Sequence, residues 1–178
     1  MDKSPDNATK LLAHTALLLA ISLALTSLEH MLPPLPFAPP GVRLGLSNIV
    51  TMYALFFMGR GRAVILAVLK SLFVFLMRGV TAGILSLAGG LTSLGIMIAL
   101  ALIFRKEISY LLLSIAGAIT HNFAQIAAGS LIMETNLLSI YWPVLLISGI
   151  ILGSVMGTIL RVIMPTFGKI FGHREFHL

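Results

Sequence analysis

Long apolar runs separated by short polar breaks restrict this chain to one kind of fold. The 178-residue sequence is 58% hydrophobic and only 10% charged, and its mean hydropathy is +1.03. A soluble domain of this size does not need so much apolar surface, whereas helices that cross a lipid bilayer do. We therefore expect an all-α, polytopic membrane protein in which residues 1–178 form a single integral membrane domain.

The polar breaks divide the chain into six expected membrane-spanning helices. Glycine, proline and charged residues mark the breaks, because they are unfavourable inside a lipid-facing helix. The expected spans are 11–28, 44–58, 63–77, 80–104, 108–133 and 137–164. The second and third have only about 15 residues each, fewer than the roughly 20 that a spanning helix needs. Gly89-Gly90 is expected to interrupt the fourth.

The distribution of lysine and arginine predicts the orientation of these helices. If the N-terminus is inside the cell, the inside segments contain Lys3, Lys10, Arg60, Arg62, Arg105, Lys106, Lys169 and Arg174. The outside loops then contain only Arg43 and Arg78. Cytoplasmic loops carry an excess of positive charge, so we expect a multi-pass protein with both termini in the cytoplasm and a proline-rich outer loop.

The composition excludes several classes of function. The absence of cysteine rules out disulfides, thiolate chemistry and cysteine metal sites. The sequence contains no glycine-rich nucleotide-binding motif and no basic tract with interleaved aromatic residues. We expect no cofactor, no metal and no nucleic-acid partner, and ATP hydrolysis would have to come from a separate chain.

Polar residues gather at mid-membrane and in the expected outer half. Residues 33–48 contain prolines, a cation and small polar side chains, and they run directly into the second span. Lys70 lies about 12 Å from either end of the third span, where a lysine costs about 2.5–3.5 kcal/mol unless it faces a cavity or a partner. The expected substrate-binding residues are Arg43, Asn48, Thr51, Lys70, Arg78, His121, Asn122 and Gln125.

Cations outnumber acids in this group, so the expected ligand is small and anionic. Glu29 and His30 are expected to act as a lid, with residues 29–43 gating the site. The sequence is also compatible with purely structural roles: Lys70 can snorkel to the interface, Arg78 can anchor its helix there, and the polar residues of the fifth span can simply join helices.

Catalysis is not expected from this chain. Its spans contain no carboxylate pair for acid–base chemistry. The only aspartates are Asp2 and Asp6, so the chain cannot build the aspartate-rich magnesium motifs of conventional prenyl diphosphate synthesis.

Two stripes of small residues predict close helix packing. Ala16, Ala20 and Ala24 recur every four residues in the first span and form one smooth face. This face can dock a partner protein or pack against another span of the same chain. The glycines at positions 149, 153 and 157 form a similar stripe, for which we expect internal packing.

Two sequence segments resemble a known family. Gly41–Asn48 (Gly-Val-Arg-Leu-Gly-Leu-Ser-Asn) and the Met-Gly-Arg-Gly-Arg run at 58–62 are similar to the "Gx transporter" family, whose members are often labelled heptaprenyl diphosphate synthase component I. The six short spans and the alanine stripe also resemble the S components of energy-coupling factor (ECF) vitamin transporters.

The likeness to S components implies a substrate-binding subunit in a bacterial cytoplasmic membrane. Such a subunit captures a vitamin or precursor from outside and works with an ECF T component and ATPase subunits. The alanines would then face the T component. The alternative is a membrane accessory subunit associated with prenyl diphosphate (quinone side chain) synthesis. A stand-alone secondary transporter is disfavoured, because no acid inside the spans would couple protons or sodium.

Overall fold

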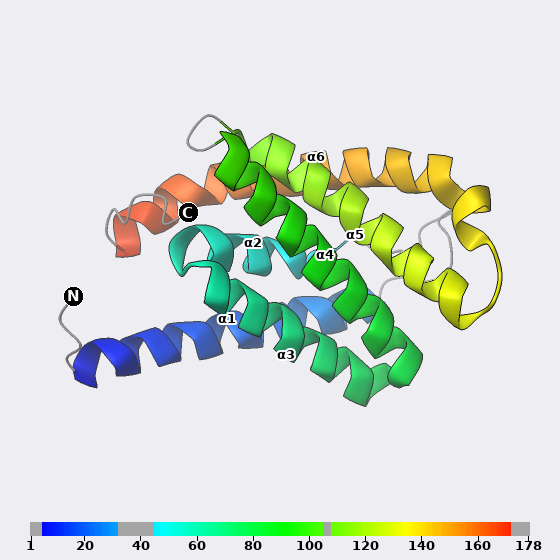
Figure 1. Cartoon of the computed structure of the whole chain (residues 1–178). Coiled ribbons are helices and arrows are strands. Elements are labelled where there is room, and N and C mark those ends of the chain that lie inside the picture. Colours follow the sequence, from blue (N-terminus) through cyan, green and yellow to red (C-terminus); the bar gives the residue numbers. More distant parts are fainter. Residues whose placement is uncertain (1–4, 32–44, 105–107, 172–178) are drawn as a thin grey trace.

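The computed structural model describes residues 5–31, 45–104 and 108–171, with side chains for 9–31, 45–104 and 108–163. The described chain consists of six α-helices (Figure 1). They are α1 (Pro5–Met31), α2 (Asn48–Phe57), α3 (Arg60–Arg78), α4 (Val80–Phe104), α5 (Tyr110–Ile132) and α6 (Leu137–Phe171). The all-α prediction and the order of the six helices are confirmed.

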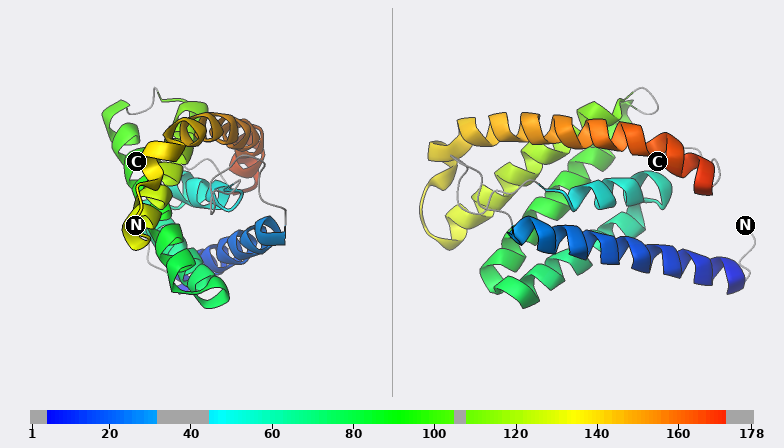
Figure 2. Two further views of the ribbon diagram at one scale, coloured as in Figure 1. Left: turned by 90° about the vertical axis from the view of Figure 1, so that its right-hand side faces the viewer. Right: turned by 180° about the vertical axis from the view of Figure 1, so that it is seen from behind.

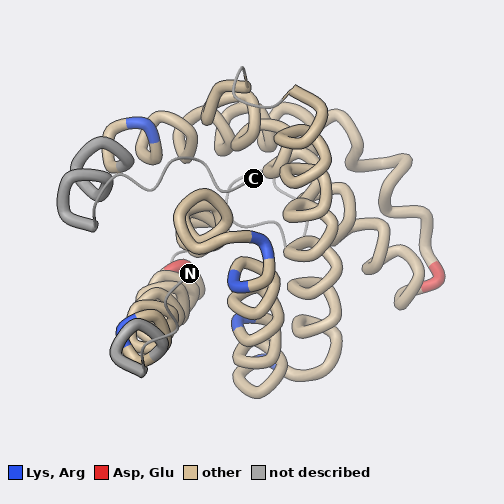
Figure 3. Tube along the Cα trace, turned by 60° about the vertical axis from the view of Figure 1, so that its left-hand side comes forward, with Lys and Arg blue, Asp and Glu red and all other residues tan. Residues whose placement is uncertain are grey.

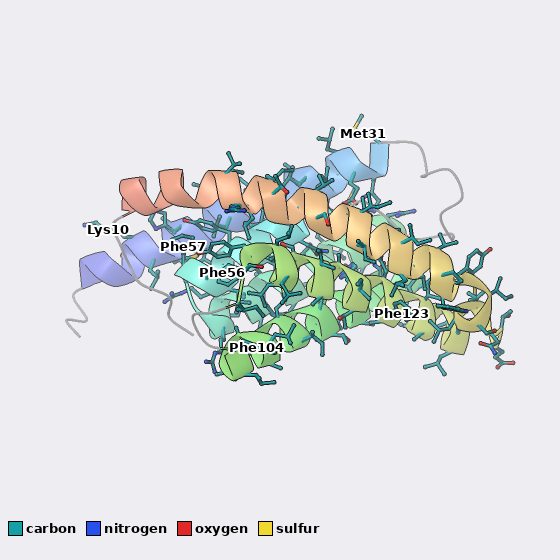
Figure 4. The ribbon with its side chains drawn as sticks, turned by 90° about the horizontal axis from the view of Figure 1, so that it is seen from above. Lys10, Met31, Phe56, Phe57, Phe104 and Phe123 are labelled. Carbon is teal, nitrogen blue, oxygen red and sulfur yellow. The ribbon has the colours of Figure 1, made fainter. Side chains whose placement is uncertain are left out.

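Successive helices run in opposite directions. The start of α1, the turn between α2 and α3, and the end of α6 lie at one end of the bundle (Figures 1 and 2). Lys10 and Phe57 also lie towards this end, whereas Met31 lies at the opposite end (Figure 4). The arrangement therefore gathers the cations of residues 10, 60 and 62 at one end, and which side of the membrane this end faces stays a prediction.

Four helices are long and apolar enough to cross a membrane among the described residues: Thr9–Met31, Val80–Phe104, Tyr110–Ile132 and Leu137–Ile163. These apolar helices make the chain a membrane protein. α3 has 19 residues, about 28 Å at 1.5 Å per residue, but it carries charges at both ends and Lys70 between them. α2 has only 10 residues, about 15 Å, and is too short to cross alone.

Two expected helix features are wrong. The second helix begins at Asn48 rather than near Leu44, because residues 46 and 47 form a turn and Gly45 has a φ of +73°. Gly89-Gly90 does not interrupt the fourth helix, which is continuous from Val80 to Phe104. Glycine lowers helix propensity by only about 1 kcal/mol, and packing against neighbouring helices offsets this cost.

The short helix α2 forms the centre of the bundle, with the other helices around it (Figure 2). Its residues Met52, Ala54, Leu55 and Phe56 are buried and belong to the main apolar cluster with side chains of the other helices. Phe56 also meets the ring of Tyr110 edge to face, with 5.0 Å between ring centroids. α2 is therefore held by contacts on all sides rather than by its length.

The glycine stripe of α6 packs directly on α5. A Cβ atom added at Gly153 would lie 2.5 Å from the Cα atom of Ile115, and one at Gly149 would lie 2.8 Å from the Cα atom of Ile119. Only hydrogen fits between backbones at this separation. The predicted internal packing of this stripe is confirmed.

The two faces of α1 differ in chemistry. Ser22, Thr26 and Glu29 are buried and share one face, because positions four and seven residues apart lie close together on a helix. The alanines at positions 16, 20 and 24 lie on the opposite face and are exposed. They do not pack against another helix of the described chain, so packing between the described helices does not account for this stripe.

Candidate functional site

A buried lysine joins α3 to the start of α2. Lys70 is 4% exposed, and its Nζ atom donates hydrogen bonds to Asn48 Oδ1 at 2.8 Å and to Ser47 Oγ at 3.3 Å. α3 carries most of the basic positions marked on the described chain (Figure 3). Since the ammonium group of Lys70 bonds inside the protein, it does not snorkel to the interface.

A tight turn before α2 positions Asn48 for this contact. Gly45 has a φ of +73°, a conformation that glycine adopts readily, and its carbonyl oxygen accepts a 2.8 Å bond from the backbone N–H of Asn48. A Cβ atom at Gly45 would lie 3.0 Å from Asn48 Nδ2. The backbone N–H of Gly45 donates to Oε1 of Glu29, so α1 helps to hold the turn.

His121 lies on α5 and faces Gly89 of α4. A Cβ atom at Gly89 would lie 2.9 Å from His121 Nδ1 and 2.7 Å from Gln125 Cγ, so the imidazole rests on a position where only glycine leaves room. Its Nδ1 atom is buried and makes no hydrogen bond to the described residues. The ammonium group of Lys70 is also near enough for its positive charge to act on this ring.

A small cavity of about 30 Å³ lies beside Asn48. Its walls come from the turn before α2 and from α2, α4, α5 and α6. The lining residues are Gly45, Asn48, Ile49, Met52, Ser93, Met97, Gly117, Ala118 and Met156. This volume suits one or two water molecules, so a larger ligand would need the surrounding side chains to move.

The structure does not bring every expected binding residue to Lys70. Asn122 donates to Ser148 Oγ at 3.3 Å and joins α5 to α6, a structural role that the sequence also allowed. Thr51 is buried within α2. Arg78 is exposed at the end of α3, because eight residues turn its side chain by about 80° and carry it about 12 Å along the helix. Arg43 lies outside the described residues.

Glu29 and His30 have different surroundings from those expected of a lid. α1 continues to Met31, past the expected end at residue 28, so both residues are helical. Glu29 faces inward, is 6% exposed and attracts the Lys70 ammonium group. His30 Nδ1 contacts the carbonyl oxygen of Thr26 one turn earlier. Residues 32–43 of the expected gate lie outside the described residues.

The site therefore consists of Glu29, Gly45, Ser47, Asn48, Lys70, Gly89, His121 and Gln125. The expected binding residues did not include Gly45, Ser47 or Gly89. Gly89 had a usable signal, because a glycine inside a long apolar helix often marks a close approach of another side chain. The role of Gly45 depends on a carboxylate 16 residues away and has no local signal.

A model of the family described as heptaprenyl diphosphate synthase component I matches residues 18–163. The chain belongs to this family. The matched range contains all eight residues of the site and two of the three alanines of α1, since Ala16 precedes it. No curated protein and no solved structure matches the chain at a significant level. The predicted resemblance to the component I family is confirmed, whereas the likeness to S components stays a prediction.

In this component I family member, Gly89→Ala is expected to move His121 and lower stability by about 1 kcal/mol, because the new methyl group overlaps the imidazole and Gln125. The shift of the histidine signals in an NMR spectrum and the thermal unfolding temperature measure these effects. Gly90→Ala is the matched control, since its Cβ atom would lie 3.9 Å from Ala67 Cβ, an ordinary contact. Equal responses of the two variants would contradict the proposed packing of His121.

Proposed function

We propose that this chain is the membrane-embedded, non-catalytic component of a two-component prenyl diphosphate synthase. The family match over residues 18–163 carries the proposal, because a "component I" implies at least one further component. The chain itself has only two aspartates, at positions 2 and 6. The magnesium-binding carboxylates that activate a diphosphate leaving group would therefore come from the partner chain.

The chain would contribute a membrane site for an amphipathic molecule. A prenyl diphosphate has an apolar chain that dissolves in lipid and an anionic head that needs cations and hydrogen-bond donors. Lys70 supplies a buried cation, and Asn48 and Ser47 supply polar partners around it. The methionine-lined cavity beside Asn48 supplies an adaptable apolar wall.

Gentle purification from native membranes, followed by mass spectrometry of the complex, tests this function. We expect a soluble prenyltransferase to co-purify, and its rate of prenyl chain elongation to rise several-fold when this chain is present in nanodiscs. The proposal fails if a prenyltransferase neither co-purifies nor responds to this chain.

The exposed alanine stripe of α1 favours a second candidate, the solute-binding subunit of an ECF-type importer. Without large side chains, this face allows a helix of another membrane protein to approach closely. In this case a T component and ATPase subunits would co-purify in place of the prenyltransferase.

Two tryptophan variants test the use of the alanine face. Ala20→Trp should abolish co-purification of the T component, because the indole ring separates the two helices. Ile21→Trp is the matched control, since position 21 is also exposed but is turned by about 100° from Ala20. Retained complex in the Ala20→Trp variant would argue against docking through this face.

A further inference from the structure

The carboxylate of Glu29 lies inside the same polar group as Lys70. Both side chains are buried, at 6% and 4% exposure. Glu29 accepts the Gly45 N–H bond, and Gly45 contacts Asn48, which in turn accepts a bond from Lys70 at 2.8 Å. One acid and one cation thus lie around a single turn, and their charges offset each other.

This balance conflicts with the binding of an anion at Lys70. A ligand anion would place a second negative charge beside Glu29 in a region shielded from water, where like charges strongly disfavour each other. The cavity beside Asn48 measures only about 30 Å³ and leaves no room for a phosphate-sized group. Withdrawal of the Glu29 side chain would remove the competing charge and vacate its volume.

We propose that Glu29 is an internal substitute for the anionic ligand, and that a ligand anion displaces its carboxylate from the Gly45 turn beside Lys70. Its withdrawal also frees the Gly45 N–H group, so ligand binding loosens the contact between the end of α1 and the turn before α2. This inference rests on the proposed anion site, and it assigns to Glu29 the role of setting how tightly that site binds.

Glu29→Gln separates charge from shape, because the amide oxygen of glutamine can still accept the Gly45 N–H bond. Calorimetric titration of the nanodisc-embedded chain with inorganic diphosphate measures affinity. We expect Glu29→Gln to bind at least about tenfold more tightly than the unmodified chain, since one competing unit charge is gone. Glu134→Gln is the matched control, because Glu134 is exposed in the turn before α6, and it should leave affinity unchanged.

The double variant Lys70→Met/Glu29→Gln serves as the binding-deficient reference, because it lacks both the Lys70 cation that would attract the ligand and the Glu29 carboxylate that would compete with it. If Glu29→Gln binds diphosphate no more tightly than the unmodified chain, the inference is wrong, although the anion site stands as long as the double variant loses binding. If the unmodified chain and Glu29→Gln both fail to bind diphosphate, the inference and the proposed anion site are both wrong. Co-purification of the prenyltransferase tests the rest of the proposed function independently.

A distance measurement tests the displacement without changing position 29. The sequence has no cysteine, so spin labels at Met31→Cys and Leu46→Cys report only the separation between the end of α1 and the turn before α2. Met31 is exposed at the far end of α1 (Figure 4). We expect saturating diphosphate to lengthen or broaden this distance. An unchanged distance at saturation would overturn the displacement.

Discussion

Replacing Lys70 with methionine is expected to destabilise the folded protein by about 3–5 kcal/mol, the usual effect of leaving a buried charge without the opposite charge that compensates it. Methionine has a similar length but carries no charge and no hydrogen-bond donor. Glu29 would remain buried without its cation, and Asn48 and Ser47 would lose the donor that they now share. Thermal unfolding in nanodiscs, followed by the loss of the folded protein's peak in size-exclusion chromatography, measures the effect.

The double variant Lys70→Met/Glu29→Gln shows whether the loss comes from the stranded acid. Neutral residues of similar shape often replace a buried ion pair at little cost, so the double variant should recover most of the lost stability. Lys10→Met is a suitable control, because Lys10 is exposed near the start of α1. A Lys70→Met protein as stable as the unmodified chain would show that the buried charge of Lys70 contributes nothing to the fold.

Gly153→Ala is expected to destabilise the contact between α5 and α6 by about 3 kcal/mol, the upper part of the range for overpacking. The new methyl group would lie 2.5 Å from Ile115 Cα and 2.9 Å from the carbonyl oxygen of Ser114. These are backbone atoms, so no side-chain rotation relieves the overlap and the helices must separate. The unfolding temperature of the purified protein in nanodiscs measures the change.

Gly95→Ala provides the comparison for this substitution. Gly95 lies in α4, and a Cβ atom there would meet nothing within 4 Å. Since alanine is the better helix former by about 1 kcal/mol, this variant should be as stable as the unmodified protein or slightly more stable. If Gly153→Ala behaved in the same way, the close packing of α5 on α6 would be refuted.

The sequence predicted the helices well because their ends have a local cause. Charges, glycines and prolines interrupt apolar runs wherever the chain leaves its apolar surroundings, so α3, α4, α5 and the start of α6 lie close to their expected positions. The predicted start of α2 was wrong because hydropathy does not distinguish a helix from a turn of equal polarity. The conformation at Gly45 depends on the carboxylate of Glu29, which belongs to another helix.

The candidate site was predictable only in part. The cost of a mid-helix lysine correctly marked Lys70 as a buried residue with partners. Periodicity assigns a residue to a face of its helix but does not identify the neighbouring helix. His121 and Asn122 are adjacent in sequence, yet the first meets Gly89 of α4 and the second bonds Ser148 of α6. Their separation of about 100° on the helix decides which of them can belong to the site.

The shortness of α2 has a consequence for how the protein enters its membrane. A helix of 10 residues covers about half of a hydrocarbon layer roughly 30 Å thick, and the turn before it leaves peptide groups that lipid would not tolerate. This segment therefore has no stable state as a separate inserted helix. It can reach its place only when other helices already surround it, so we expect α2 to be among the last helices to settle although it is among the first to be synthesised.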